Sequence, residues 1–457
     1  MTTIAAGFES ETSARGERAP SRSFVHRLAL LAVALAITAS GLVMTEPAPV
    51  DALTIGLIVL LPVVGLVAIN PALLSYLCLW LTAGAAAVLA ASFSLDLRAT
   101  MIHVAVTLYL YVASFVFAAF VAKKPRPHTE LILKAWTLAA LLAAGAAIVG
   151  YFDLLPGAYD LFTRYDRASG TFKDPNVFAP FVIVPILYMV SVALERRLRG
   201  MLLPLSVAGF LTLAAFLSFS RGAWVNLAVS LTIFGYLSLA TTRRADVRLK
   251  IIGLLTAGVL IVAFVVVAAL NSDQVANLLS ERASFEQSYD TGAEGRFGGQ
   301  QKAMGLIVEH PLGIGAQEFT TRHHPEEVHN VYLSMLLNAG WLGGGIYWIL
   351  VALTLALGLR HALKATETRV LFLVVYATFA ATAFEGVIVD TDHWRHFYLL
   401  MAIVWGLMFA KRTTATAEPA RARRAPRLVG RKAAPAAYPA RSLAQRRRAR
   451  IVGAATS

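Results

Sequence analysis

The sequence has only one cysteine and few charged residues. Because Cys78 is the single cysteine, no disulfide can form within the chain; it lies inside an apolar run. No Cys/His cluster has the spacing of a zinc site. Charged residues make up 15% of the chain and hydrophobic residues 57%, with a mean hydropathy of +0.64, whereas soluble proteins average about 25% charged residues. A soluble fold of 457 residues cannot bury this much apolar surface. The composition therefore predicts an integral membrane protein.

Positive charge is concentrated at the C-terminal end. Residues 411–457 contain 13 Lys/Arg and one acid, Glu418, which accounts for most of the formal net charge of +14. A basic segment directly after a final apolar run is typical of a cytoplasmic tail beside anionic lipids, and its Ala/Arg/Pro-rich composition predicts disorder. The sequence pI near 10 is therefore no evidence for a nucleic-acid partner.

Apolar runs of about 20 residues, the length that crosses a bilayer, recur along the chain. We expect an all-α integral membrane domain over residues 28–410, between a cytoplasmic N-terminal tail (residues 1–27) and the basic tail (residues 411–457). About 12 spans are predicted, near residues 28–44, 52–69, 72–94, 100–122, 131–151, 176–194, 201–219, 222–240, 250–270, 329–358, 370–389 and 397–410.

Basic residues gather in four short loops, at residues 123–126, 196–199, 243–250 and 360–369. With 12 spans, these loops and both termini fall on one side, which the positive-inside rule identifies as the cytoplasm. The loop at residues 45–51 (TEPAPVD) carries no basic residue, as expected for the opposite, outer side.

A long polar insert, residues 271–328, separates the ninth and tenth spans on the outer side. Inserts of this length are more often functional than idle. Its residues 295–309 predict an amphipathic helix suited to the membrane surface, ended by His310-Pro311. One apolar side would carry Phe297, Met304, Ile307 and Val308. Gly313 and Gly315 predict a turn, and residues 325–327 (PEE) predict the start of the next helix.

Three basic side chains of the outer side are candidates for chemistry: Arg221 (in SFSRGAW), Arg296 (in GRFGG) and His329 (in HNVYL). Each also has a structural interpretation that involves no chemistry. Arg221 would be a boundary arginine whose charge reaches the headgroups, Arg296 a solvated loop arginine, and His329 a histidine that caps a helix. Together they suggest an anion site, because guanidinium groups bind phosphate or pyrophosphate bidentately. A neutral imidazole at a helix amino end can accept a proton from a hydroxyl.

Weaker candidates lie in two other outer segments. In GTFKDPNVFAP (residues 170–180), Asp174 and Asn176 start a helix and are candidates to line a polar site as well. The last outer loop contains Asp390, Asp392, His393, Arg395 and His396, a cluster that either binds an anion or is solvated at the interface. Gly340, Gly343, Gly344 and Gly345 predict close helix packing.

At these residues the chain resembles the O-antigen ligase and polymerase superfamily of bacterial membrane glycosyltransferases. His329-Asn330, followed by nine residues and Gly340-Trp341-Leu342-Gly343, is similar to the family's most specific signature. The segments SRGAW, GRFGGQQKAM, HPLGIGAQEF and GTFKDPNVFAP also resemble family segments, so the resemblance covers roughly residues 170–345.

The resemblance implies a C-type membrane glycosyltransferase in the bacterial inner membrane, with a periplasmic active site and no metal or cofactor. Its donor would be a glycan on undecaprenyl pyrophosphate, held by Arg221 and Arg296. His329 would orient or deprotonate the acceptor hydroxyl, with inversion at the anomeric carbon. Asn330, Asn176, Asp174 and Arg395 would be weaker substrate contacts. QQKAM after Arg296, where many relatives have aromatic residues, leaves the local geometry open.

The acceptor is not decided by these motifs. A ligase would use lipid A-core oligosaccharide, and a polymerase would use a second lipid-linked glycan, in O-antigen or exopolysaccharide synthesis. The alternative is a 12-span transporter or flippase for lipid-linked polysaccharide, which predicts charged residues near the membrane midplane. The notable in-span charges, Lys134 and Glu385, lie close to predicted ends. A non-catalytic membrane scaffold would tolerate loss of Arg221 and His329.

Overall fold

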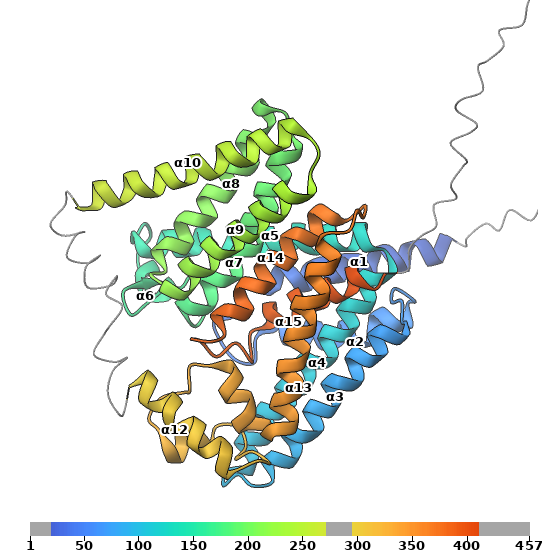
Figure 1. Cartoon of the computed structure of the whole chain (residues 1–457), viewed down its shortest axis with the longest axis vertical. Helices are drawn as coiled ribbons and strands as arrows, with labels where there is room; N and C mark the ends of the chain where they lie inside the picture. Colours follow the sequence, from blue (N-terminus) through green and yellow to red (C-terminus); the bar gives the residue numbers. More distant parts are fainter. Residues whose placement is uncertain (1–19, 271–294, 411–457) are drawn as a thin grey trace, which may run out of the picture. The chain divides into compact units, whose positions relative to one another are not determined.

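The computed structural model describes residues 20–270 and 295–410, which are helical almost throughout. Residues 1–19, 271–294 and 411–457, which include the predicted basic tail, lie outside the described residues. Each of the 12 predicted spans coincides with a helix (Figure 1). In chain order these are α1 (Pro20–Ala39), α2 (Pro49–Val63), α3 (Pro71–Ala91), α4 (Leu97–Lys123), α5 (Pro125–Tyr151), α7 (Pro175–Glu195), α8 (Leu198–Leu217), α9 (Arg221–Thr241), α10 (Ala245–Leu270), α13 (Val331–Ala362), α14 (Arg369–Glu385) and α15 (Arg395–Met408).

Seven of these helices are long and apolar enough to cross a membrane: α3, α4, α5, α7, α8, α9 and α13. Shorter apolar helices occupy Phe24–Ala39, Pro49–Val63 and Arg395–Met408. Large apolar side chains also lie exposed on the bundle, among them Leu203 (73%), Leu142 (56%) and Ile349 (52%), as expected for surfaces that face lipid. The prediction of an all-α integral membrane protein is confirmed, and the exact number of 12 spans stays a prediction.

The helices begin where the sequence provides a proline or a capping side chain. Proline is the first residue of α1, α2, α3, α5 and α7, where its missing N–H costs no hydrogen bond. Asn70 caps α3 by accepting the Leu73 N–H at 3.0 Å, and Asp96 caps α4 by accepting the Ala99 N–H at 3.0 Å. These signals are local, which explains why the helix positions could be predicted.

An aromatic cluster joins α3, α4, α13 and α15 in the core. Trp80 stacks on Tyr111 with ring centroids 4.1 Å apart, and Tyr76 stacks on Trp405 at 4.5 Å. The Tyr76 and Ser114 hydroxyls are hydrogen-bonded at 2.7 Å. Each aromatic pair adds roughly 0.5–1.5 kcal/mol beyond the area that it buries. This cluster therefore fixes the helices on which much of the candidate site rests.

Hydrogen bonds between loops join segments that the sequence assigned to the same side. On the predicted outer side, Val43 N–H donates to Thr171 O at 2.8 Å, and Leu95 N–H donates to Glu318 Oε1 at 2.6 Å. On the predicted cytoplasmic side, Asn70 Nδ2 donates to Phe409 O at 2.9 Å. The alternation of loops between two ends of the bundle is therefore consistent with these contacts.

The described part of the insert contains α12 (Arg296–Glu309) and the short π-helix η1 (Phe319–His323). The predicted helix is confirmed, and it ends before His310-Pro311 as expected. Positive φ angles at Gly313 (+85°) and Gly315 (+92°) confirm the turn. Residues 271–294 of the insert are not described, and its location at the membrane surface stays a prediction.

Two predictions about this region are wrong. Ile307 does not share a side with Phe297, Met304 and Val308: Ile307 is buried at 8%, and the other three are 57%, 52% and 71% exposed. The helix thus has two apolar sides, and the buried one packs against Phe319, Val328 and Leu337. Residues 325–327 do not start a helix either, because α13 begins only at Val331, where Asn330 supplies the cap.

A small structured segment between α5 and α7 was not predicted. It consists of α6 (Ala158–Phe162) and an antiparallel hairpin of β1 (Thr163–Arg164) and β2 (Arg167–Ala168). Helix and strands here are too short to leave a periodic pattern.

Helix α13 is broken at Gly340, whose φ is +65°. An added Cβ there would lie 2.6 Å from the Leu312 carbonyl carbon and 2.7 Å from Pro311 O, so only glycine fits. At the break, Trp341 N–H donates to Pro311 O at 2.9 Å, and Ile314 N–H donates to Leu337 O at 2.8 Å. Gly343 and Gly344 would also clash with neighbours if they carried a Cβ, and Gly345 would not. Close packing is confirmed for the first three glycines.

Candidate active site

His329 and Asn330 lie at the amino end of α13. Asn330 is its N-cap and accepts the N–H groups of Tyr332 at 3.1 Å and Leu333 at 3.3 Å. His329 precedes it with a φ of +53°, a left-handed conformation that is unusual for histidine. Its side chain is 29% exposed, and Nε2 lies 3.8 Å from Glu326 Oε2. The imidazole is thus accessible at a helix amino end, where the dipole disfavours its protonated form.

The carboxylate of Asp390 holds this segment in place. It accepts the N–H groups of His329 at 2.7 Å and Asn330 at 3.2 Å, and the Ser334 hydroxyl at 2.5 Å. Burial, reinforced by the nearby Asp392 carboxylate, raises the pKa of Asp390 to about 7. The sequence pointed to Asp390 only as part of a polar loop, because nothing local connects it to His329.

Arg296 is the first residue of α12 and lies half-buried near the same segment. One turn later, Gln300 Nε2 donates to His329 O at 3.3 Å. Gly299 packs on the His324 ring so closely that an added Cβ would lie 3.0 Å from Cε1. These contacts hold the amino end of α12 against the chain that leads into α13.

Arg221 is the first residue of α9, after the N-cap Ser220. Its neighbour Gly222 packs on Glu385, since an added Cβ would lie 2.9 Å from Glu385 Oε1. Gly386 directly follows α14, and its carbonyl accepts the Val331 N–H at 2.9 Å. The start of α9, which carries Arg221, is therefore connected to the amino end of α13 through the packing of Gly222 and one hydrogen bond.

Asp174 and Asn176 start α7, as predicted, and an unpredicted arginine fastens them to the Arg221 turn. Asp174 Oδ1 accepts the Asn176 N–H at 2.7 Å. Arg167, in β2, donates from Nη2 to Asn176 Oδ1 and from Nε to Ser218 O, both at 2.7 Å. No motif surrounds Arg167 in the sequence, so its bridging position is visible only in the structure.

Arg395, the remaining predicted contact, pairs with a carboxylate of the chain itself. Its Nε and Nη2 donate to the two Asp51 oxygens at 2.6 and 2.7 Å. This bidentate pair connects α15 to α2, and it occupies the two guanidinium nitrogens that would otherwise bind a substrate anion side by side. A substrate role for Arg395 therefore stays a prediction.

The site contains both signs of charge. Arg221 and Arg296 each occupy the first position of a helix, where backbone N–H groups add partial positive charge. Glu327 is open to solvent, yet the surrounding protein and the carboxylates of Asp392 and Asp174 raise its pKa. The arrangement combines an anion-binding element with acceptor groups for hydroxyls.

Residues 205–349 match the family model described as O-antigen ligase. This stretch runs from α8 into α13 and includes Arg221, Arg296, His329 and Gly340. Over these residues the chain is similar to the O-antigen ligase family. It is also similar to a general O-oligosaccharyltransferase of Acinetobacter baylyi, with 27% identity over 299 residues that cover 61% of this chain and 50% of that protein. The chain thus spans about half the length of the curated relative that it matches.

Proposed function

We propose that this protein transfers a glycan from undecaprenyl pyrophosphate to an acceptor hydroxyl at the periplasmic face of the bacterial inner membrane. The observation that carries the proposal is that the helix starts with Arg221 and Arg296 are both linked, through neighbouring residues, to the amino end of α13, where His329 lies. It rests on the Gln300–His329 hydrogen bond and on the contacts of Gly222 and Gly386. The match of residues 205–349 to the O-antigen ligase family model and the similarity to an oligosaccharyltransferase support a transfer reaction.

In the proposed reaction, the acceptor oxygen attacks the anomeric carbon and forms the new glycosidic bond. The bond from that carbon to the pyrophosphate oxygen breaks, and the configuration is inverted. Arg221 and Arg296 stabilise the charge that develops on the pyrophosphate, which requires no metal ion. Their positions at helix amino ends add backbone N–H groups to the same task.

His329 receives the proton of the attacking hydroxyl, or orients that hydroxyl. The helix dipole favours the neutral imidazole needed for this role. A positioned general base contributes roughly 10²–10⁴-fold to a rate. Glu326, at 3.8 Å from the imidazole, stabilises its protonated form after transfer.

The alternative of a transporter finds less support. Lys134 is largely exposed and pairs with Glu130 at 3.5 Å. Glu385 is buried at the last residue of α14, where Asn226 Nδ2 donates to it at 2.7 Å. Both charges are thus bound to neighbours near helix ends or on the surface, which does not suggest a transport path through the midplane.

The test is transfer by the purified chain in proteoliposomes, with a radiolabelled glycan on undecaprenyl pyrophosphate and EDTA present. Lipid A-core, further lipid-linked glycan and a Ser/Thr-containing protein are offered as separate acceptors. We expect label to move to one of them, which identifies the acceptor class, and to be lost with His329→Ala and Arg221→Lys. Arg322→Ala is the matched control, since Arg322 is 50% exposed on the same insert.

Two outcomes would count against this proposal. Equal transfer by wild type, His329→Ala and Arg221→Lys would remove these residues from the mechanism. Movement of the lipid-linked glycan across the bilayer, without transfer to any acceptor, would identify a transporter instead.

A further inference from the structure

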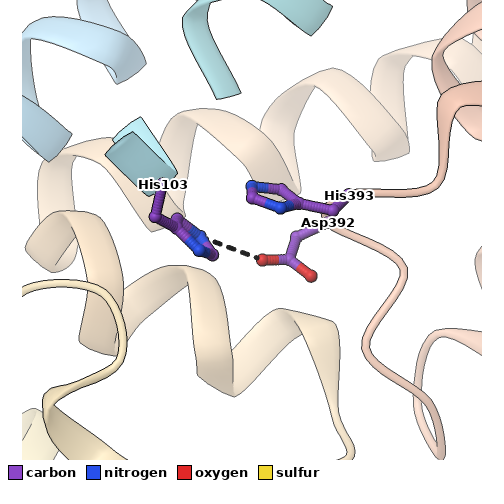
Figure 2. A group of neighbouring side chains, drawn as sticks. All are labelled: His103, Asp392 and His393. Atoms are coloured by element: carbon purple, nitrogen blue, oxygen red, sulfur yellow. Dashed lines mark ion pairs between the residues drawn. The ribbon is translucent and has the colours of Figure 1, made fainter. Parts of the chain in front are cut away.

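Three potential metal ligands from distant parts of the chain meet beside the candidate active site. His103 lies in α4, and Asp392 and His393 lie in the turn between α14 and α15. Their ligand atoms are all within 4.8 Å of one another, and His103 Nε2 lies 3.6 Å from Asp392 Oδ2. Figure 2 shows the three side chains gathered together, with an ion pair between His103 and Asp392, and the His103 and His393 rings are stacked with their centroids 3.9 Å apart. All three side chains are largely sheltered from solvent.

A neighbouring hydroxyl determines which nitrogen of His393 has a free lone pair. The Thr107 hydroxyl donates its single proton to His103 O at 3.1 Å. Thr107 Oγ1 is also 3.0 Å from His393 Nε2, and with its own proton on His103 O it serves as the acceptor for the His393 tautomer that has the proton on Nε2. His393 Nε2 is then protonated, and Nδ1 retains the lone pair. Metal-binding histidines are commonly oriented in this way by a hydrogen bond at the second nitrogen.

We propose that His103, Asp392 and His393 form a binding site for a first-row divalent metal ion, of which Zn²⁺ fits the ligands best. Two imidazoles and one carboxylate suit Zn²⁺ and its neighbours, whereas Ca²⁺ and Mg²⁺ prefer oxygen ligands only. Tetrahedral Zn²⁺ with bonds of about 2.0–2.1 Å brings its ligand atoms to roughly 3.4 Å from one another. The ligand atoms here lie within 4.8 Å of one another, so to bind the ion they must move closer together and the stacked His103 and His393 rings must turn toward a common point.

The position of the site indicates a structural task. A metal ion bound there connects α4 to the turn that carries Asp390, the residue that holds His329. The ion would therefore stiffen this turn without touching the reacting atoms. The inference does not depend on glycan transfer, since metal binding is measured without substrate, and it is compatible with chemistry that uses no metal.

The experiment is a calorimetric titration of the purified full chain in detergent with Zn²⁺, after removal of bound metal by a chelator. The affinity tag must contain no histidine. We expect one Zn²⁺ per chain and a loss of affinity of at least about tenfold in His103→Gln and in His393→Gln. His310→Gln, an exposed histidine outside the cluster, is the matched control and keeps the wild-type affinity. Thermal unfolding shows that each variant is folded, and we expect Zn²⁺ to raise the midpoint of the wild type and of His310→Gln but not of His103→Gln or His393→Gln.

A second measurement decides the matter if the variants do not fold. Co²⁺ bound to the wild type gives an intense visible absorption band when it is four-coordinate and a weak one when it stays hydrated. An intense band that Zn²⁺ abolishes supports the site. A weak band, or Zn²⁺ affinity that is unchanged in both variants, overturns the inference and identifies the three side chains as a hydrogen-bonded network only.

Discussion

The carboxylate of Asp390 accepts the backbone N–H of His329 at 2.7 Å, across 61 positions of sequence. His329 has a φ of +53° at this point, a conformation that costs on the order of 1–3 kcal/mol for a residue other than glycine. Asp390 also binds Asn330 and Ser334, so one buried side chain offsets the strain and fixes the start of α13. The placement of the candidate base therefore depends on a loop between two other helices.

Replacing Asp390 tests this dependence. In Asp390→Asn, one carboxylate oxygen becomes an amide NH₂ group, which donates hydrogen bonds and cannot accept them. Hydrogen bonds to a charged group contribute about 1.5–3 kcal/mol, so we expect turnover to fall about 10- to 100-fold. Ser334→Ala removes one donor and leaves both backbone bonds, so its loss should be smaller. Wild-type turnover in folded Asp390→Asn would show that Asp390 has no positioning role.

Two substitutions distinguish the contribution of the His329 backbone conformation to stability from the contribution of its imidazole to the transfer rate. Asparagine tolerates a left-handed φ and alanine does not. His329→Asn should therefore keep the thermal unfolding midpoint of the wild type and lose about 10²–10⁴-fold in transfer rate. His329→Ala should lose the same activity and also unfold at a lower temperature. Transfer at the wild-type rate by His329→Asn would exclude the imidazole as a base.

Two glycines of α13 form a matched pair for a packing test. An added Cβ at Gly340 meets backbone atoms at 2.6–2.7 Å and requires a φ of +65°, whereas at Gly345 nothing lies within 4 Å. Gly340→Ala should destabilise the fold by about 2 kcal/mol or more, because both strain and overpacking act there. Gly345→Ala should be neutral or stabilising by up to about 1 kcal/mol. Equal unfolding midpoints for the two variants would contradict the described break in α13.

The Asp51–Arg395 pair can be examined by a double-mutant cycle. Both side chains are mostly buried, at 13% and 19% exposure. Asp51→Asn or Arg395→Gln should each cost about 1–3 kcal/mol in unfolding free energy, and the double variant should recover part of it. If Arg395 binds substrate as well, Arg395→Gln raises KM even when Asp51 is already Asn. An unchanged KM for Arg395→Gln in the Asp51→Asn background would show that Arg395 has only the structural role of joining α2 to α15.

Local sequence signals predicted the helices and the ends at which the candidate residues lie. The span predicted at residues 222–240 and the helix predicted at residues 295–309 put Arg221 and Arg296 near helix starts, and each is the first residue of its helix in the structure. The direction in which α12 faces could not be predicted, because apolar residues occupy two sides of it. Only the packing partners decide that Ile307 is buried.

Contacts between distant segments escaped the sequence analysis for one reason. Arg167 and Ser218, Asp390 and His329, and His103 and Asp392 each belong to different loops or helices. Polar residues in loops are common, and spacing identifies ligands only when they are close along the chain. The ligand spacing typical of zinc sites could not reveal His103, Asp392 and His393, because α4 and the last outer loop are far apart in the sequence.

The break in α13 has a mechanical consequence. Its freed hydrogen-bonding groups are taken by Pro311 and Ile314, and the Trp341 indole donates to Ile307 O at 2.8 Å. Helix α12 and the first part of α13 are thereby coupled into one rigid body that carries both Arg296 and His329. Arg221 lies on a separate helix, α9, whose next residue, Gly222, packs on Glu385 at the end of α14. A bulky lipid-linked substrate would thus meet two residues at constant separation and a third that a different helix supplies.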